Sequence, residues 1–147
     1  SGAKAAIISA RWHSEICDQL VAGATRAVKE ANIQSIDLHE VPGSFELPLA
    51  AKLALTNGAD FGVGLGVVLR GETPHFDYVC QGVTNGVMKV SLKLDKPIGF
   101  GVLTVDNIEQ AIARSGAPGS KEDKGYDSAI AALELLRLKR QLSGRFA

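Results

Sequence analysis

Apolar residues recur along this chain in two patterns, and each pattern predicts one kind of secondary structure. Within residues 35–41, Ile36 and Leu38 alternate with Asp37 and His39, which predicts a strand with one buried face. Apolar runs without alternation are typical of strands that are covered on both faces of a parallel sheet. Such runs predict three further strands, at residues 4–10, 60–69 and 97–105.

Between the strands, apolar residues recur at the three- and four-residue spacing of amphipathic helices. Thr73 can cap the longest helix, and Pro74 suits its first position because a missing N–H costs nothing there. Asp106 or Asn107 is expected to cap a short helix. The predicted helices span residues 14–31, 47–57, 74–94, 107–115 and 126–142. The last one is expected to pack through Ile130, Leu133, Leu136 and Leu138.

Strand and helix alternate four times, which predicts one α/β domain over residues 1–147. Parallel strands joined by helical crossovers place helices on both faces of the sheet. The expected architecture is therefore a three-layer sandwich around a four-stranded parallel sheet.

Composition narrows the classes of function. The chain has 16 Lys and Arg against 16 Asp and Glu, so it offers no basic stripe for nucleic acid. It has no apolar run of transmembrane length and no visible signal peptide, so we expect a cytoplasmic protein without a membrane partner. Cys17 and Cys80 form no CxxC pattern, which favours reduced thiols and predicts no metal site. Ser1 and Gly2 are consistent with a tag or a trimmed start.

Residue types that carry chemistry gather where the predicted strands end. In open parallel sheets, ligands bind outside the carboxyl ends of the strands. Those ends carry four polar segments, at residues 11–13, 42–46, 70–75 and 103–107. We therefore expect the functional site at this edge of the sheet.

The segment at residues 70–75 combines a tight turn with the start of a helix. Gly71 permits the turn, and the amides from Gly71 to Thr73 should face outward as an anion site. His75 lies in the first helical turn, where the helix dipole disfavours the imidazolium. A neutral His75 beside a bound phosphate is suited to proton transfer. A histidine that only completes the helix start explains the spacing equally well.

Three further features each leave two interpretations open. Gly43, Ser44 and Glu46 offer amides, a hydroxyl and a carboxylate that suit a polyol, but a capping arrangement with Ser44 as N-cap also explains them. Trp12 directly follows the first strand, where its ring can stack on a planar heterocycle or fill a core or an interface. Arg114 suits phosphate binding, or it stabilises the end of its helix as a solvated charge.

Other motifs argue against alternative sites. Gly62, Gly64 and Gly66 resemble a dinucleotide fingerprint, but they lie inside a strand and not at a strand-to-helix turn. They are expected to permit close helix packing. His13 and His39 have no carboxylate or cysteine at ligand spacing, so neither predicts a metal.

The chain resembles the lumazine synthase family in three segments. These are PGSFELP at residues 42–48, GVVLRGETPHFDYV at 66–79 and FGVLTVDNIEQA at 100–111. A DKG segment at 123–125 agrees as well. The resemblance runs from the first strand to the last helix, and it implies a flavodoxin-like strand order, 2-1-3-4.

The resemblance also implies roles for single residues. His75 matches the proton-transfer histidine of the family, and Trp12 occupies the position of the aromatic residue that stacks on the pyrimidine. Asp127 matches a position close to the site. The pyrimidine and ribityl chain would be bound by Trp12, Gly43, Ser44, Glu46, Val67, Val68, Phe100 and Lys124. The phosphate would be bound by Gly71, Glu72, Thr73 and Arg114.

The implied activity is a transferase reaction of riboflavin biosynthesis that needs no cofactor and no metal. It condenses 5-amino-6-(D-ribitylamino)uracil with 3,4-dihydroxy-2-butanone 4-phosphate to 6,7-dimethyl-8-ribityllumazine, with release of phosphate and water. The family forms homopentamers, in which Phe100, Arg114 and Lys124 would reach the site of the adjacent subunit. The loop between Arg114 and Lys124 is slightly longer than in family members that form shells, which favours a free pentamer over a shell of pentamers. Trp12 stands where many members carry Phe, and its larger ring predicts riboflavin binding.

Two other interpretations compete with this enzyme. A flavin-binding or scaffold protein of the same fold would show no turnover, although His75, Arg114 and Lys124 are all present. A dinucleotide-binding protein is disfavoured, because the fingerprint and the acidic residue that should follow it are both missing.

Overall fold

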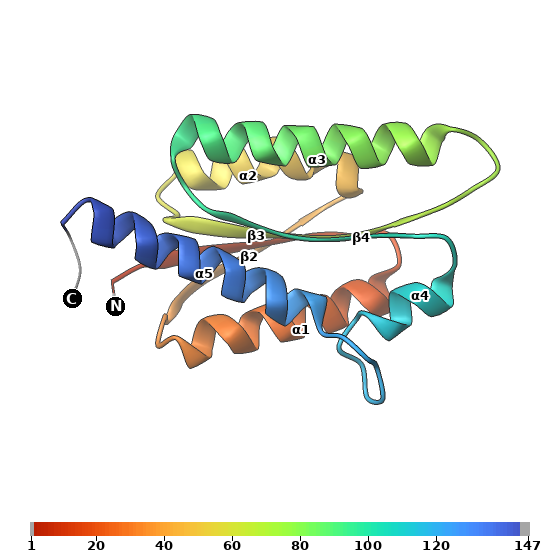
Figure 1. Cartoon of the computed structure of the whole chain (residues 1–147), viewed down its shortest axis with the longest axis horizontal. Coiled ribbons are helices and arrows are strands. Elements are labelled where there is room, and N and C mark those ends of the chain that lie inside the picture. The colour runs from red at the N-terminus through yellow and green to blue at the C-terminus, as the bar shows by residue number, and fades with distance from the viewer. Residues whose placement is uncertain (1, 145–147) are drawn as a thin grey trace.

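The computed structural model describes residues 2–144 and consists of a parallel sheet between two layers of helices (Figure 1). The four strands are β1 (Lys4–Ala10), β2 (Ser35–Val41), β3 (Phe61–Leu69) and β4 (Ile98–Val105). Their order is β2-β1-β3-β4, and every neighbouring pair is parallel. This confirms the predicted α/β sandwich, its flavodoxin-like strand order and the bounds of β1 and β2.

The helices divide between the two faces of the sheet (Figure 1). One layer holds α1 (Ser14–Glu30), α4 (Ile108–Ala113) and α5 (Lys124–Leu142). The other layer holds the short 3₁₀ turn η1 (Ser44–Glu46), α2 (Leu47–Thr56) and α3 (His75–Leu94).

The core lies on both sides of the sheet because the side chains of each strand alternate between its faces. Ile7 packs with α1 and α5, whereas its neighbour Ile8 packs with α2 and α3. On the first side, Leu20 and Val28 of α1 are fully buried. On the second side, Val83 is the most deeply buried residue of α3. The helical periodicity of the sequence therefore identified the right faces.

Two expected core positions are exposed instead. Leu38 is 60% exposed, because β2 is an edge strand that pairs only with β1. Leu138 is 46% exposed, whereas Leu136 is buried and Ile130 and Leu133 are partly buried against the core, as predicted for this helix. The buried face of α5 consists of Gly125, Ser128, Ala129, Ala132 and Leu136.

The helix starts differ slightly from the prediction. Asn107 caps α4, since its side chain accepts a hydrogen bond from the Gln110 amide at 2.9 Å. Helix α3 begins one residue late, with Pro74 at the N-cap position. Helix α5 begins two residues early, because the Asp123 carboxylate accepts from the Tyr126 amide and caps it.

Candidate functional site

A cavity of about 740 Å³ opens at the carboxyl ends of β1, β2 and β3. This is the position where open parallel sheets bind ligands, and the volume lies in the usual range for small-molecule sites. It brings together residues from three segments that are far apart in the sequence. The lining residues are Trp12, His13, Gly43, Ser44, Phe45, Glu46, Val67, Val68, Leu69, His75, Tyr78 and Val79.

Trp12 presents its ring to this cavity. The indole is 68% exposed, so the interpretation as a core aromatic is wrong. Its ring lies over the backbone of Gly43, where an added Cβ would stand 3.4 Å from Trp12 Cδ1. The Cys17 thiol donates to the Trp12 carbonyl at 3.3 Å, and His13 adopts a left-handed conformation with φ of 59°. The turn before α1 thus fixes the backbone that carries the ring.

Glu46, and not Ser44, closes the turn between β2 and α2. The Gly43 amide donates to Glu46 Oε1 at 2.9 Å, and Gly43 is the N-cap residue of η1. The interpretation of Ser44 as N-cap is therefore wrong. The Ser44 hydroxyl is buried and has no hydrogen-bond partner within residues 2–144. A buried polar group without a partner is rare, and it is suited to pair with a ligand in the adjoining cavity.

The glycines of β3 explain how Ser44 comes so close to the sheet. A Cβ on Gly66 would overlap Ser44 Oγ and lie 3.3 Å from Ala10 Cβ. Gly62 and Gly64 leave ordinary van der Waals space, with no atom nearer than 3.5 Å. The expected close packing therefore applies to Gly66 alone.

His75 is the first residue of α3 and lines the same cavity. The turn before it, from Gly71 to Thr73, is exposed. Within residues 2–144 the amides of Gly71, Glu72 and Thr73 donate no hydrogen bond. Free amides at a helix N-terminus attract anions. The proton-transfer candidate and the anion candidate are thus neighbours in space as well as in sequence.

Six predicted site residues do not line this cavity in the single chain. Gly71, Glu72 and Thr73 form the exposed turn next to His75, whereas Phe100, Arg114 and Lys124 belong to later segments of the chain. Arg114 Nε and Lys124 Nζ approach the two oxygens of Glu122, at 3.6 Å and 3.0 Å. The hydrogen bond from Lys124 lowers the pKa of the Glu122 carboxyl. Phe100 is 40% exposed on the edge strand β4. The structure therefore places the two cations together, but it does not bring them to His75.

Sequence reasoning missed several residues that line the cavity. Tyr78 follows His75 by three positions on α3, so helical spacing alone would have placed both on one face. Phe45 also lines the cavity, but in the 42–48 segment only its polar neighbours were predicted to belong to the site. His13 belongs to the segment 11–13 at the expected functional edge, but the only role considered for it by itself was that of a metal ligand; it lines the cavity beside Trp12.

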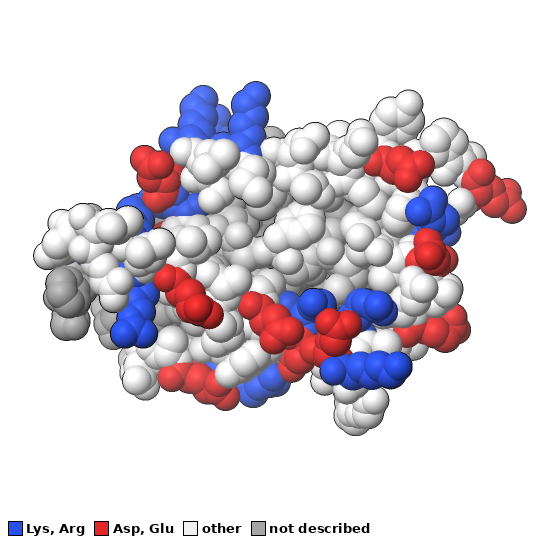
Figure 2. Space-filling model, viewed as in Figure 1, with Lys and Arg blue, Asp and Glu red and all other residues white. Residues whose placement is uncertain are grey.

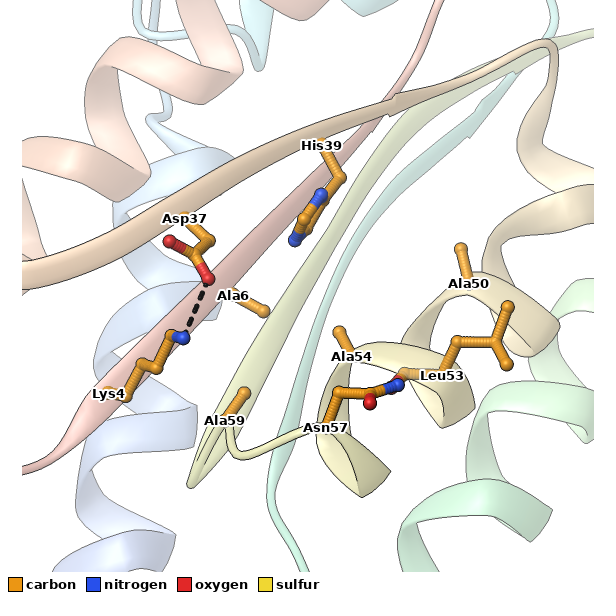
Figure 3. A pocket seen from close by; sticks show the side chains of 9 residues that line it. All are labelled: Lys4, Ala6, Asp37, His39, Ala50, Leu53, Ala54, Asn57 and Ala59. Atoms are coloured by element: carbon orange, nitrogen blue, oxygen red, sulfur yellow. Dashed lines mark hydrogen bonds and ion pairs between the residues drawn. The ribbon is translucent and has the colours of Figure 1, made fainter.

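A second cavity, of about 300 Å³, lies at the opposite end of the sheet (Figure 3). Lys4 and Asp37 form an ion pair at 3.0 Å on its wall, and His39 and Asn57 also line it. It lies at the start of β1, away from the carboxyl ends of the strands. The rest of its lining is mainly Ala and Leu side chains, so it offers less chemistry than the larger cavity.

Metal-binding clusters and membrane-spanning helices are both absent from residues 2–144. These residues contain no group of three His, Cys, Asp or Glu side chains that could hold a metal ion. Over the same residues, every helix is too short or too polar to cross a bilayer.

Comparison with known proteins gives one consistent family. The model of the 6,7-dimethyl-8-ribityllumazine synthase family matches residues 2–140. A 6,7-dimethyl-8-ribityllumazine synthase of Streptomyces coelicolor is 51% identical over 140 residues, covering 95% of this chain and 87% of that protein. One of Paenarthrobacter aurescens is 54% identical over 140 residues, covering 95% and 86%.

Solved structures add nothing to this assignment. A GDP-L-fucose synthetase of Naegleria fowleri aligns with 99% of this chain and 47% of its own, at 11% identity and a TM-score of 0.36. A likeness this low carries no argument about fold or function.

Proposed function

Because this chain belongs to the 6,7-dimethyl-8-ribityllumazine synthase family of riboflavin biosynthesis, we propose that its cavity at the strand ends is the site of that reaction. The enzyme condenses 5-amino-6-(D-ribitylamino)uracil with 3,4-dihydroxy-2-butanone 4-phosphate. The products are 6,7-dimethyl-8-ribityllumazine, phosphate and water. Residues 1–147 act as one catalytic domain in this proposal, since the family match extends over residues 2–140.

One observation carries the assignment of the site. His75 stands between the free amides of Gly71 to Thr73 and a cavity that Trp12 and Ser44 also line. A phosphate on the amides and a pyrimidine against Trp12 would place the reacting carbons beside the imidazole. Glu46, Val67 and Val68 would complete the pyrimidine and ribityl side of the cavity.

The chemistry needs positioning and proton transfer. The 5-amino group attacks the ketone and loses water to give an imine. Loss of the C3 proton then expels phosphate and leaves an enol, which tautomerises to a ketone. Attack of the ribitylamino nitrogen on this ketone, with loss of a second water, closes the ring. His75 is placed to accept and return these protons, while the free amides stabilise the departing phosphate. Holding both substrates together lowers the entropic part of the barrier.

Three residues that the family resemblance assigns to the site do not line the cavity of their own subunit, so we propose a homopentamer with shared sites. Phe100, Arg114 and Lys124 lie outside the cavity that holds His75, and all three are partly exposed. In a pentamer they would face the cavity of the adjacent subunit. The molecular face that carries β4 has few charged side chains at its centre (Figure 2), as expected for a surface that is covered in an assembly.

The test is an absorbance assay that follows formation of the lumazine from both purified substrates, against a control without enzyme. We expect clear acceleration by the wild-type protein. His75→Ala should lower turnover about a hundredfold, near the low end of the range for one proton-transfer group, because the positioning of the substrates survives. The assembly, measured by light scattering, should not change. Full turnover in His75→Ala would remove this residue from the mechanism.

A second candidate function rests on the exposed ring of Trp12. We propose that riboflavin binds there, since its planar ring system matches a stacking surface. Titration with riboflavin should quench the fluorescence of Trp12, the one tryptophan of the chain. Quenching without any lumazine formation would identify a flavin-binding protein of this fold, and no quenching would exclude flavin binding at Trp12.

A further inference from the structure

Arg70 joins three elements at the edge of the cavity. It follows the last residue of β3, and its amide donates to the Val105 carbonyl at 2.9 Å. Its guanidinium Nε lies 2.7 Å from Asp106 Oδ1, just beyond the end of β4. The same guanidinium stacks over the ring of Phe76 at 4.3 Å, and Nη1 lies 3.9 Å from Asp77 Oδ1.

These contacts contribute little to the stability of the fold. The Arg70 side chain is 51% exposed, and its two carboxylate partners are 60% and 63% exposed. Ion pairs at such exposure are worth little, because water screens them and long side chains lose entropy. The cluster therefore needs another explanation than stability.

Apart from the packing of Phe76 and Val79 against the core, the start of α3 is weakly attached. The helix has no side-chain cap, and the Thr73 hydroxyl accepts from the His75 amide only at a long 3.4 Å. The amides of the preceding turn find no partner within residues 2–144. Arg70 holds this turn to the strands through the two residues that follow His75.

Helical geometry links these two residues to the direction of His75. Successive side chains of an α-helix point about 100° apart around the axis. Once Phe76 and Asp77 are held on the Arg70 side, His75 can only point away from that side, and it lines the cavity. From this arrangement we propose that Arg70 is a positioning residue, which sets the rotation of the first turn of α3 and so aims His75 at the substrates.

The cluster also extends to the helix that ends at Arg114. The Asp106 amide donates to Gln110 Oε1 at 2.7 Å, and the Gln110 carbonyl accepts from Arg114 Nη1 at 2.9 Å. The backbone of Asp106, the residue whose carboxylate pairs with Arg70, is therefore held by α4. A planar guanidinium meets all three partners at once, whereas a lysine ammonium cannot both stack on Phe76 and keep the same directions.

The test uses Arg70→Lys, which keeps the charge but loses the planar group. We expect its kcat to fall roughly tenfold to a hundredfold, the effect of a small misplacement of a reacting group. The KM for the aminouracil should stay within about twofold, because the ring and ribityl contacts lie on other elements. In NMR spectra, the His75 imidazole resonance, assigned by its loss in His75→Gln, should shift or broaden. The imidazole resonances of His13 and His39 should neither shift nor broaden.

The matched control is Arg26→Lys. Arg26 makes the same two kinds of contact, with Asp123 at 2.6 Å and with the ring of Tyr126 at 4.7 Å, between α1 and α5. The Arg26→Lys variant should lose as little thermal stability as the Arg70→Lys variant, and its kcat should equal that of the wild type. If the Arg70→Lys variant proves unstable, Asp106→Asn is used as the second variant. Its kcat should also fall, but by less than the kcat of Arg70→Lys.

Two outcomes would overturn the proposal. One is an unchanged kcat in Arg70→Lys. The other is a lower kcat with an unchanged His75 resonance, which would mean that Arg70 touches the phosphate directly. The inference rests on the proposed function, but the NMR result is separate from it. A wild-type protein without turnover would reject the proposed function, and the His75 resonance would still decide whether Arg70 orients that side chain.

Discussion

Ser44 shows at the residue scale how a group that is unfavourable for folding can serve binding. Ser44 is only 6% exposed, and its buried hydroxyl makes no hydrogen bond within the described chain. Burial without a partner costs free energy, so the fold gains nothing from this oxygen. Ser44 lines the cavity next to Glu46, so a substrate hydroxyl or ring nitrogen that reaches the covered oxygen would complete its hydrogen bonding.

Ser44→Ala should therefore act in opposite directions on folding and on binding. We expect the unliganded protein to keep or raise its unfolding temperature, since a buried unpaired group is removed. The KM for the aminouracil should rise about three- to tenfold, the value of one hydrogen bond. Thermal unfolding and steady-state kinetics measure the two effects. A lower unfolding temperature with an unchanged KM would show that the hydroxyl has a structural partner.

Cys17 is the residue whose protonation is most altered by folding. It is 1% exposed, and burial raises the pKa of its thiol from 9.0 to about 11. Below pH 9 the thiol is protonated in both the folded and the unfolded chain. Between pH 9 and about 11 only the unfolded chain releases the proton, so the free energy of unfolding falls as the pH rises.

Wild-type protein should lose about 3 kcal/mol of stability across that interval through this group. Denaturant unfolding at several pH values measures the loss. Cys17→Ala lacks the titrating thiol, so its stability should fall less steeply, and the difference between the two curves isolates Cys17 from Cys80. Parallel curves for the two proteins would mean that the thiol ionises freely in the folded state.

At the scale of one element, β3 shows that a glycine-rich strand is not uniformly dependent on glycine. The sequence pattern treated Gly62, Gly64 and Gly66 alike. Only Gly66 meets a side chain, that of Ser44, at a distance which excludes a Cβ. The reason is tertiary, because η1 packs on β3 at that residue and not at the other two.

Gly66→Ala and Gly62→Ala form a matched pair in one strand. We expect Gly66→Ala to cost about 1–3 kcal/mol of stability, as overpacking of a tight site does, and to impair substrate binding by displacing Ser44. Gly62→Ala should change stability by much less, since its nearest neighbour would stand at an ordinary 3.5 Å. Denaturant unfolding measures the free energy of unfolding of both variants. Equal losses of stability in the two variants would contradict the packing argument.

On the scale of the whole molecule, the separation of His75 from Arg114 becomes the main feature. His75 lines the cavity, while Arg114 lies on the other side of the sheet, where it contacts Glu122. Helix α3 also leaves Tyr78, Met88 and Leu92 largely exposed, which is apolar surface that a neighbouring subunit would cover. Both features fit subunits that complete one another's sites.

Mixing two inactive variants tests this sharing. His75→Ala and Arg114→Ala subunits, each assembled alone, should have low activity. After unfolding and joint reassembly in equal amounts, about a quarter of the sites would combine a native His75 with a native Arg114 from the neighbour. We therefore expect the mixed assembly to form lumazine at about a quarter of the wild-type rate. No recovery would show that each subunit works alone.

The helices and strands follow from the amino-acid sequence alone, because their signals are local. Apolar periodicity, the Asn107 cap and the alternation of strands with helices depend on neighbours within one or two turns. The sequence also determines which edge of the sheet carries the predicted functional residues, because parallel strands bring all their carboxyl ends together. The motifs around Gly43 and His75 are therefore assigned to one site by their order along the chain.

Which groups meet is a matter of tertiary packing. Packing buries the Ser44 hydroxyl without a partner, exposes Leu38 on an edge strand and joins Arg114 and Lys124 through Glu122. It also brings Arg70 against the residues that follow His75. These facts depend on contacts between distant segments, whose distances a linear pattern does not contain. Exposure and pairing are properties of the packed molecule, whereas periodicity is a property of the chain.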